Sequence, residues 1–401
     1  MSMRGGFVTL LMVGAMASAS CAGSVTGHAG PGLTPVDPKT LNTGPYKAEP
    51  TAYEPDITSS ADVRSIEAQR LLNYLTPSYE IDSDINVLGD IKVFFDGNQL
   101  AESNTFPEKY RSAGVDNNLL LGVYVSRINE NLRSRKKLII SVLRFPTDTA
   151  AMKAANDFDS TTNSDPGRHQ VPITGHPDAK TSSTDDVTGI SFLAHGPYVV
   201  MTNVGIPEPN QAGLTEVIRK TLDKQIARLD QTQPTPLDDI LDLPVDPDSI
   251  MRRALPRASD YSDPYIYDWD FGPFQPTGEL HFERNPAEAA KAFDESGVDL
   301  VARRGGIIYR TRDLSGAFRL QSTLTKAGKN DDVLDPPPGL HDARCVKLDK
   351  TDPYRLFDGL CAVVYGRYVG VVMSKMLSSA RVDHALYQRA AAQYSILAKS
   401  E

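Results

Sequence analysis

The spacing of apolar residues along residues 61–401 changes between a helical period and short strand-like runs. Ile218, Leu222, Ile226 and Leu229 recur at a four-residue or three-residue spacing, so they fall on one face of a predicted helix. Brief runs rich in β-branched residues predict strands between the helices. The predicted helices cover residues 106–113, 149–158, 286–296 and 315–324, and the predicted strands cover 119–127, 137–145, 189–196, 197–205, 301–311, 360–366 and 367–374.

This mixture of helices and strands lacks strict alternation, which predicts the α+β class. We expect antiparallel sheets, each covered by helices on one face. Gly114 and Gly297 stand where a glycine commonly ends a helix. Gly196 and Gly366 fall between paired strands, at predicted hairpin turns.

The two halves of the chain repeat each other. The segment YRSAGVDNNLLLGVYVSR, which ends at Arg127, matches FDESGVDLVARRGGIIYR, which ends at Arg310, without a gap, and this match pairs Gly122 with Gly305. A duplication of one unit predicts two related domains rather than a solenoid of short repeats. Two further matches follow in the same order, GHPDAK (175–180) with GLHDAR (339–344) and AHGPYVVMTNVG (194–205) with VYGRYVGVVMSK (364–375). A helical pattern follows in each unit, and in the second unit Val382, Leu386, Ala390 and Tyr394 share its face.

Proline-rich segments divide the chain. Residues 22–60 are rich in Gly, Pro, Thr and Ser, which is typical of a flexible tether. Prolines interrupt residues 231–264 too often for a long helix, so the domain junction is expected there. We therefore predict a signal peptide over 1–20, a tether over 21–60, a first α+β domain over 61–230, a linker over 231–276 and a second α+β domain over 277–401.

The N-terminus carries an export signal. Arg4 precedes an apolar run of eleven residues, Phe7 to Ala17, which is shorter than the roughly 20 residues of a spanning helix. Cys21 follows a series of small residues, as in bacterial lipoprotein signals, where the thiol is acylated with fatty acids such as palmitate and the chain is cut before it. Ser18 departs from the usual branched aliphatic, and the Ala-Ser-Ala motif at 17–19 allows simple secretion instead.

The charge balance excludes nucleic-acid binding. The chain carries a formal net charge of −9, and removal of residues 1–20 takes away only Arg4, which leaves −10. A protein that binds phosphate backbones needs clustered cations, which an acidic chain of pI 5.4 does not provide.

The three cysteines fit an exported protein. If Cys21 takes lipid, Cys345 and Cys361 remain as a pair, and in an oxidising compartment a disulfide is expected. The repeat places Thr181 and Ser191 at the comparable positions of the first unit, which therefore lacks the bridge. Two cysteines are too few to hold a metal ion in a cysteine-ligated site. No metal or other cofactor is expected.

A resemblance to a known family rests on SCAGSVTGHAGPG (20–32), LNTGPYKAEP (41–50) and the duplicated body. These segments resemble an uncharacterised family of mycobacterial and related actinobacterial cell-envelope lipoproteins, and the likeness covers nearly the whole mature chain. The resemblance implies that Cys21 is acylated despite Ser18 and that the protein is attached to the membrane by its lipid. It implies no reaction and no ligand.

Two histidines are the main candidates for chemistry. His176 and His341 are matched between the repeats, and each is followed by an aspartate, Asp178 or Asp342. A histidine bonded to a carboxylate can act as a general base or a metal ligand. A nucleophile elbow is missing, however, and a catalytic metal needs about three protein ligands. The alternative is that both histidines cap a loop or a strand.

The linker and one hairpin offer candidate binding surfaces. The segment DPYIYDWDFGPF gathers Tyr265, Tyr267, Trp269 and Phe271, which either contact a carbohydrate or lipid or fill the seam between the units. The basic segment RSRKK (133–137) lies between two predicted strands, and it is either a solvated hairpin tip or a contact for an anionic glycan or phospholipid.

These patterns favour a protein without enzymatic activity. We expect an exported, lipid-anchored module on the extracytoplasmic face that binds an envelope lipid, glycan or protein in a groove between its units. A hydrolase of envelope lipid or glycan, acting through the His176/His341 region, is the alternative. Convergence of His176, Asp178 and a serine or second carboxylate in a cleft would favour the hydrolase.

Overall fold

The computed structural model of the chain describes residues 32–102, 105–257, 270–375 and 383–400. From Gly32 onward the chain belongs to one compact unit. Cys21, Tyr265, Tyr267 and Trp269 lie outside the described residues, so the predictions made for them stay predictions. Across the described ranges, no helix combines the length and apolarity that a membrane crossing requires.

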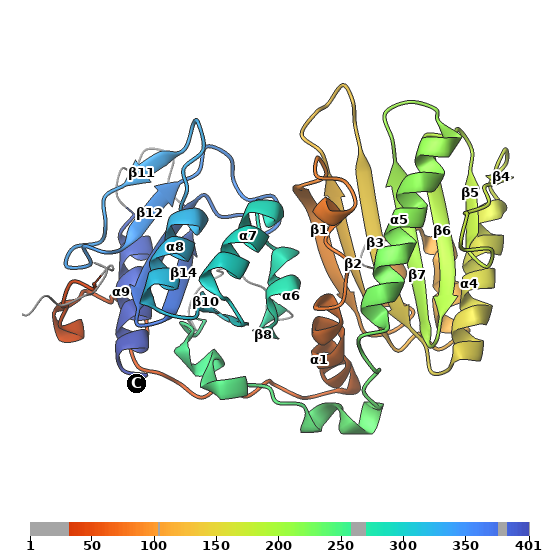
Figure 1. Ribbon diagram of the computed structural model, residues 1–401. Helices are drawn as coiled ribbons and strands as arrows, with labels where there is room; N and C mark the ends of the chain where they lie inside the picture. The colour runs from red at the N-terminus through yellow and green to blue at the C-terminus, as the bar shows by residue number, and fades with distance from the viewer. Residues whose placement is uncertain (1–31, 103–104, 258–269, 376–382, 401) are drawn as a thin grey trace, which may run out of the picture. The chain divides into compact units, whose positions relative to one another are not determined.

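The first module consists of one seven-stranded antiparallel sheet and its helices (Figure 1). Its spatial order is β1–β2–β3–β7–β6–β5–β4. The strands are β1 (Val87–Phe94), β2 (Leu121–Ile128), β3 (Lys137–Arg144), β4 (His169–Gln170), β5 (Lys180–Ser183), β6 (Thr188–His195) and β7 (Tyr198–Gly205), and the helices are α1 (Ser60–Leu72), α2 (Gln99–Glu102), α3 (Arg111–Val115), α4 (Asp148–Asn163) and α5 (Gln211–Leu229).

The second module is a second seven-stranded antiparallel sheet with four helices among its described residues. Its spatial order is β11–β12–β13–β14–β10–β9–β8. The strands are β8 (Gly272–Phe274), β9 (Leu300–Arg303), β10 (Ile307–Arg310), β11 (Asp332–Leu334), β12 (Arg344–Lys347), β13 (Gly359–Tyr365) and β14 (Tyr368–Ser374), and the helices are α6 (Pro276–Leu280), α7 (Pro286–Ser296), α8 (Leu314–Leu324) and α9 (His384–Ala398).

The two sheets have the same topology. When strands are matched in chain order, β1 with β8 through β7 with β14, both sheets show the same spatial order. The closing hairpin turns at Gly196 in one module and at Gly366 in the other, both with a φ of 54°, as the sequence predicted. The α+β class and the duplication into two related domains are confirmed.

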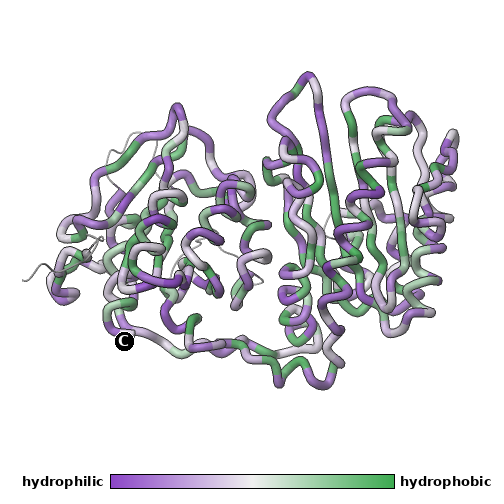
Figure 2. Tube along the Cα trace, in the orientation of Figure 1, coloured by the Kyte–Doolittle hydropathy of each residue, from purple (hydrophilic) through white to green (hydrophobic). Residues whose placement is uncertain are grey.

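Helices cover both faces of each sheet, so the expectation of one covered face was wrong. In β7, Val199 and Met201 pack in one cluster with α4, whereas Val200 and Val204 pack in another with α5. Central strands of both modules are continuous apolar runs, which is the pattern of a sheet buried on both sides. Figure 2 shows hydrophobic stretches along these strands, while hydrophilic residues lie in the loops and along the helices.

The predicted strand over 301–311 is in fact a hairpin, β9 and β10, which turns at Arg304–Gly306. Gly122 therefore lies inside β2 while Gly305 lies in a turn, and their predicted pairing was wrong. The sequence match was made without a gap, so it could not show that the β9–β10 hairpin is shorter than the β2–β3 hairpin.

The hairpin also changes the arginine pairing. Arg310 ends β10 opposite Tyr368, and Arg144 ends β3 opposite Tyr198, so Arg310 corresponds to Arg144 rather than to Arg127.

The helices before these hairpins differ between the modules. Gly297 ends α7 with a φ of 64°, as predicted. Gly114 instead lies inside α3, and the predicted helix over 106–113 is a 3-10 turn (Glu108–Tyr110) followed by α3. A Cβ at Gly114 would lie 2.8 Å from Leu100 Cδ1, so close packing rather than helix termination requires the glycine.

The N-terminal segment over 32–58 lies on the second module, where a flexible tether had been expected. The Thr34 amide and hydroxyl donate to the Asp342 carboxylate at 2.6 and 3.0 Å. Lys399 Nζ donates to Glu49 Oε1 at 2.6 Å. The segment has too few apolar residues to form a core, but side chains of the second module satisfy its backbone and hold it in an extended path.

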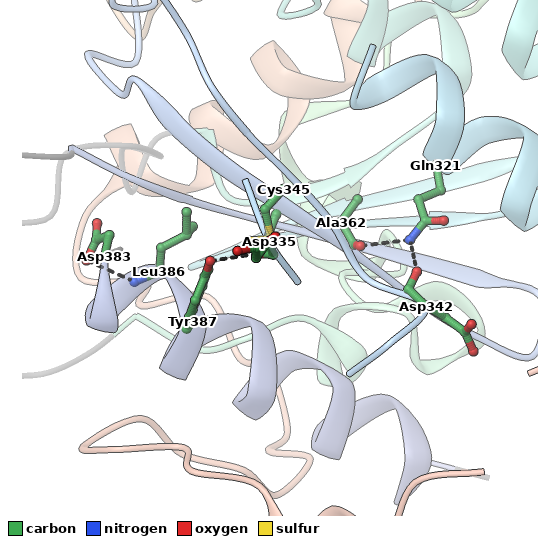
Figure 3. The surroundings of a disulfide bond; sticks show 9 residues. Gln321, Asp335, Asp342, Cys345, Ala362, Asp383, Leu386 and Tyr387 are labelled. Carbon is green, nitrogen blue, oxygen red and sulfur yellow. Dashed lines mark hydrogen bonds between the residues drawn. A yellow bond between two sulfur atoms is a disulfide. The ribbon is translucent and has the colours of Figure 1, made fainter. Parts of the chain in front are cut away.

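A disulfide joins Cys345 of β12 to Cys361 of β13, which confirms the predicted bridge (Figure 3). Gln321 of α8 donates from Nε2 to the carbonyl oxygens of Asp342 and Ala362, at 2.7 and 2.8 Å, and so links the turn before β12 to β13 beside the disulfide. These contacts lock the far half of the second sheet to α8.

Candidate functional site

Two adjoining cavities lie between α1, the N-terminal segment and the end of the linker. They share a wall of Tyr53, Pro55, Ile66, Gln69 and Phe271. The smaller cavity has a volume of about 350 Å³, and we call it the apolar chamber. The larger has a volume of about 760 Å³, and we call it the polar chamber. The apolar chamber is defined by Ile66, Val245, Phe271, Pro273, Phe274 and Leu300, and the polar chamber by Lys47, Glu54, Asp56, Asp62, Arg257 and Arg304.

Helix α1 supplies one wall of the apolar chamber. The helix begins at a capping box, in which Ser59 and Asp62 satisfy each other's backbone amides. Ile66, Gln69 and Asn73 then recur three or four positions apart, which places them on one face of the helix. At the end of the helix, Asn73 Oδ1 accepts a hydrogen bond from the Gln275 amide at 3.0 Å, which ties α1 to the segment after β8.

The end of the linker forms the opposite wall. Phe274 is fully buried and its ring packs against Phe282, with centroids 5.8 Å apart. Gly272 approaches α1 so closely that a Cβ there would lie 2.7 Å from Gln69 Oε1. A larger residue at this position would displace the Gln69 side chain from its place beside the linker.

Arg304 fixes the wall that the two chambers share. Its guanidinium donates to the carbonyl and hydroxyl oxygens of Thr51, at 3.1 and 3.0 Å, and to the Ala52 carbonyl oxygen at 3.3 Å. The guanidinium also lies 5.5 Å from the Tyr53 ring centroid. Burial lowers the pKa of Arg304, although the shift leaves the group charged at neutral pH.

The polar chamber combines charges of both signs. Lys47, Arg257 and Arg304 line it together with Glu54, Asp56 and Asp62. Hydrogen bonds from Thr58 and Ser59 lower the pKa of Asp62, so this carboxylate remains ionised at neutral pH. The near balance of charge suits a polar or zwitterionic group better than a strongly anionic one.

The predicted histidine site is not assembled. His176 Nε2 lies 2.7 Å from Asp223 Oδ1 on α5, and Asp223 also accepts from Arg219 at 2.5 Å. Asp178 is exposed and is not the partner of His176. His341 is exposed as well, and Asp342 binds Thr34. The arrangement that would have favoured a hydrolase, with His176 and Asp178 converging on a serine or second carboxylate, is therefore not formed.

The two histidines also occupy different positions of the repeat. Gly175 and Gly339 begin matching turns, with φ values of 85° and 84°. His176 directly follows Gly175, whereas His341 is two residues after Gly339. Over the ranges that the structure describes, no group of three or more histidine, cysteine, aspartate or glutamate side chains could hold a metal ion.

Of the predicted linker aromatics, Phe271 is described, and it is half-buried and lines both chambers. Sequence reasoning missed Tyr53, because its segment had the composition of a tether. It also missed Ile66 and Leu300, whose apolar character is ordinary for a helix and a strand. Arg304 lies in the turn between β9 and β10, and its role becomes visible through its long-range contacts with Thr51 and Ala52.

A cluster of buried charged and polar side chains lies beside α6. Arg303 Nη1 lies 2.7 Å from Glu279 Oε1, and both residues are wholly buried. The Tyr309 hydroxyl donates to Glu283 Oε1 at 2.7 Å. Burial raises the pKa of Glu279, and the positive charge of Arg303 opposes this shift.

Arg127 of β2 secures the end of α6. Its Nη2 donates to the carbonyl oxygens of His281 and Glu283 at 2.7 and 2.9 Å. These contacts link the first sheet to the segment that follows Gln275, so they stabilise the linker wall of the apolar chamber.

Comparisons with known proteins add little about activity. A search of characterised proteins finds none similar to the chain. Among solved structures, the extracellular domain of PknH from Mycobacterium tuberculosis aligns with 13% sequence identity and a TM-score of 0.31, and the alignment covers 41% of this chain and 97% of that domain. A likeness of this size carries no argument about function.

Two family descriptions together cover most of the described chain. The N-terminal part of a domain of unknown function, DUF7373, matches residues 54–245. The C-terminal part of the same family matches residues 250–400. The boundary between them falls within the proline-rich linker, and each match contains one of the two sheets. The chain therefore belongs to the DUF7373 family, whose two parts are the two related modules of this fold.

Proposed function

We propose that the protein is an exported binding protein that holds an amphiphilic lipid of the cell envelope. The apolar part of the lipid would occupy the apolar chamber, and its headgroup the polar chamber. The observation that carries this proposal is the wall that the two chambers share, because it places an apolar and a polar compartment side by side. Known small-molecule sites have volumes of roughly 300–1,000 Å³, and both chambers fall in that range.

The lining favours a lipid over the other envelope ligands considered. Aliphatic and aromatic side chains from α1, the linker and β9 form most of the lining of the apolar chamber, beside the polar residues Gln69, Arg70, Asn73, Gln275 and Asp299. An apolar surface of this kind binds an acyl chain through the hydrophobic effect. The mixed charges of the polar chamber favour a zwitterionic or hydroxyl-rich headgroup. A glycan alone would leave the apolar chamber without a matching group.

The disulfide supports export. Structural disulfides persist in oxidising compartments and are rare in the cytosol, so the Cys345–Cys361 bridge agrees with the signal expected from the N-terminus. Attachment through an acylated Cys21 remains part of the proposal. Mass spectrometry of the mature N-terminus tests it, because a diacylglyceryl group on Cys21 is expected, whereas an unmodified N-terminus before Cys21 would show simple secretion.

Binding of a fluorescent acyl-chain probe to the mature protein tests the ligand. Ile66→Trp fills the apolar chamber from α1, and we expect it to weaken probe binding at least about tenfold, since the volume available to the chain is lost. Leu241→Trp is the matched control, because Leu241 is 56% exposed in the same linker and lines neither chamber. Equal binding by wild type and Ile66→Trp would overturn the proposal.

Extraction of the native protein with mild detergent offers an independent check. Native mass spectrometry should then show a lipid that accompanies the wild type and is absent from Ile66→Trp. A glycan or a second protein in its place would contradict the lipid assignment.

A further inference from the structure

The hairpin between β2 and β3 ends in a tip with an unusual combination of side chains. Leu132 is 78% exposed, which exceeds the exposure of the other large hydrophobic side chains in the described part of the chain. Arg133 and Arg135 beside it are exposed too. A single exposed leucine is common on protein surfaces, so the tip matters only because apolar and cationic groups occur together on it.

The tip is held in a fixed conformation by two asparagines. Asn129 is buried, and its side chain donates to the Ser134 carbonyl oxygen at 2.6 Å and accepts from the Lys136 amide at 2.8 Å. Asn131 Oδ1 accepts from the Arg133 amide at 3.0 Å. These bonds span the loop from both sides of Leu132, so they hold the backbone of the tip in place.

The charge of the tip is concentrated at its end. Lys136 at the base is neutralised by Asp82 and Asp84, each 2.8 Å from its Nζ. Glu130 is the acidic residue within the tip. Throughout the described ranges Arg133 and Arg135 form no salt bridge, although the protein as a whole is acidic.

We propose that this tip docks on an anionic lipid bilayer, with Leu132 inserted among the acyl chains and Arg133 and Arg135 on the phosphates. Leucine loses its contact with water on insertion, while each arginine gains attraction from the negative surface potential. Charge complementarity selects the bilayer as the partner, since a purely apolar protein surface would not reward the two unpaired arginines.

Such a contact would supply a second membrane signal. A lipid anchor and a protein contact together hold a protein on a membrane more tightly than either does alone. The tip would also fix how the first module faces the bilayer, which a tether at Cys21 alone does not do. This inference does not depend on the ligand chambers, which are built from other residues.

Vesicle co-sedimentation of the mature chain carrying Cys21→Ser tests the tip, since this variant cannot be acylated. We expect binding to vesicles of phosphatidylglycerol and phosphatidylcholine, and much weaker binding to phosphatidylcholine alone. Leu132→Ser should lower the partition coefficient about tenfold. Arg133→Gln with Arg135→Gln should lower it about twenty-fivefold at low salt and remove its salt dependence.

Val333→Ser is the matched control, because Val333 is 77% exposed in the other module and has no place in the tip. It should bind as the parent does, and circular dichroism should show all variants folded. The proposal is overturned if the parent fails to bind anionic vesicles, or if Val333→Ser weakens binding as much as Leu132→Ser does. It is also overturned if the arginine variant binds as well as the parent.

Discussion

The two modules carry different side chains at equivalent positions of their two sheets. Leu121 begins β2 opposite Arg144, and Leu300 begins β9 opposite Arg310, so these two leucines are equivalent. Three residues after them come Tyr124 in the first module and Arg303 in the second. Both of these residues contact a phenylalanine from the segment that follows the edge strand.

In the first module that contact is aromatic. Tyr124 meets Phe106 edge to face, with ring centroids 5.6 Å apart, within a cluster of aromatic side chains. In the second module the Arg303 guanidinium lies 3.8 Å from the Phe282 ring centroid and pairs with Glu279. The ionic version leaves Arg303 Nε and Nη2 and Glu279 Oε2 without hydrogen-bond partners.

The comparison teaches that the strand order does not depend on the chemistry of this position. A buried ion pair often contributes less stability than well-packed apolar residues of similar size, because both charges lose their hydration. The central strands, which are buried along most of their length in both modules, are therefore the better explanation for the common fold. The ionic cluster instead fixes α6, next to the linker wall of the apolar chamber.

The largest effect is expected from breaking the ionic pair on one side. Arg303→Met leaves Glu279 buried without its partner, and we expect the free energy of unfolding to fall by about 3–5 kcal/mol. Urea denaturation measures the change. The double variant Glu279→Leu with Arg303→Tyr copies the chemistry of the first module and should regain most of the loss. A single variant within about 1 kcal/mol of wild type would show that the pair is not desolvated as described.

The disulfide gives the next largest difference between the modules. Replacing the bridge by the residues of the first module, Cys345→Thr with Cys361→Ser, should lower the unfolding free energy by about 3 kcal/mol, since the unfolded chain regains the entropy of a closed loop. The same measurement on wild type with reductant should give a similar loss. If neither treatment shifts the denaturation midpoint, the bridge is not formed in the protein.

Much of this architecture could be predicted from local patterns. The hairpins at Gly196 and Gly366 follow from apolar runs around a turn glycine, and the cysteine pair follows from compartment and count. The β9–β10 hairpin was missed because its strands are four residues each and the repeat appeared to match without a gap. Local patterns do not reveal which distant residues meet.

The candidate site was harder to predict for that reason. Phe271 was identified from its aromatic neighbours, but Tyr53 lies beside Arg304, which is far along the chain. The histidines were chosen because their chemistry is versatile, yet His176 pairs with Asp223 of α5, whereas His341 lies exposed on a different loop. Residue type indicated possible chemistry, whereas the tertiary contacts decided which residues share a cavity.

A smaller effect is expected from pH, through His281 next to the ionic cluster. Burial, with the nearby charges of Arg127 and Arg228, lowers the pKa of His281 to about 3. Its Nε2 lies 3.2 Å from the carbonyl oxygens of Leu72 and Leu75, which suits a neutral ring that donates. The unfolded histidine takes up a proton near pH 6.5, so the folded state loses stability as the pH falls from about 6.5 toward 3.

Between pH 7 and pH 5 this group should cost about 2 kcal/mol of unfolding free energy. His281→Gln keeps a donor but does not titrate, so its stability should depend less on pH over the same interval. Glu279, whose pKa is raised by burial, contributes the opposite slope, but it is present in both proteins and cancels in their difference. Parallel stability curves for the two proteins would contradict a buried neutral His281.

The smallest effect tests the first module's counterpart of the disulfide. Thr181 and Ser191 form the same cross-strand pair as the two cysteines, and their buried hydroxyl oxygens lie 2.7 Å apart. Thr181→Val keeps the shape but removes one partner, so we expect a loss of about 1 kcal/mol in urea denaturation. Thr181→Cys with Ser191→Cys should instead form a bridge, as the equivalent pair does, and raise the midpoint in the absence of reductant. If that bridge does not form under oxidising conditions, the two sheets differ locally at this pair, and the equivalence between the modules does not extend to β5 and β12.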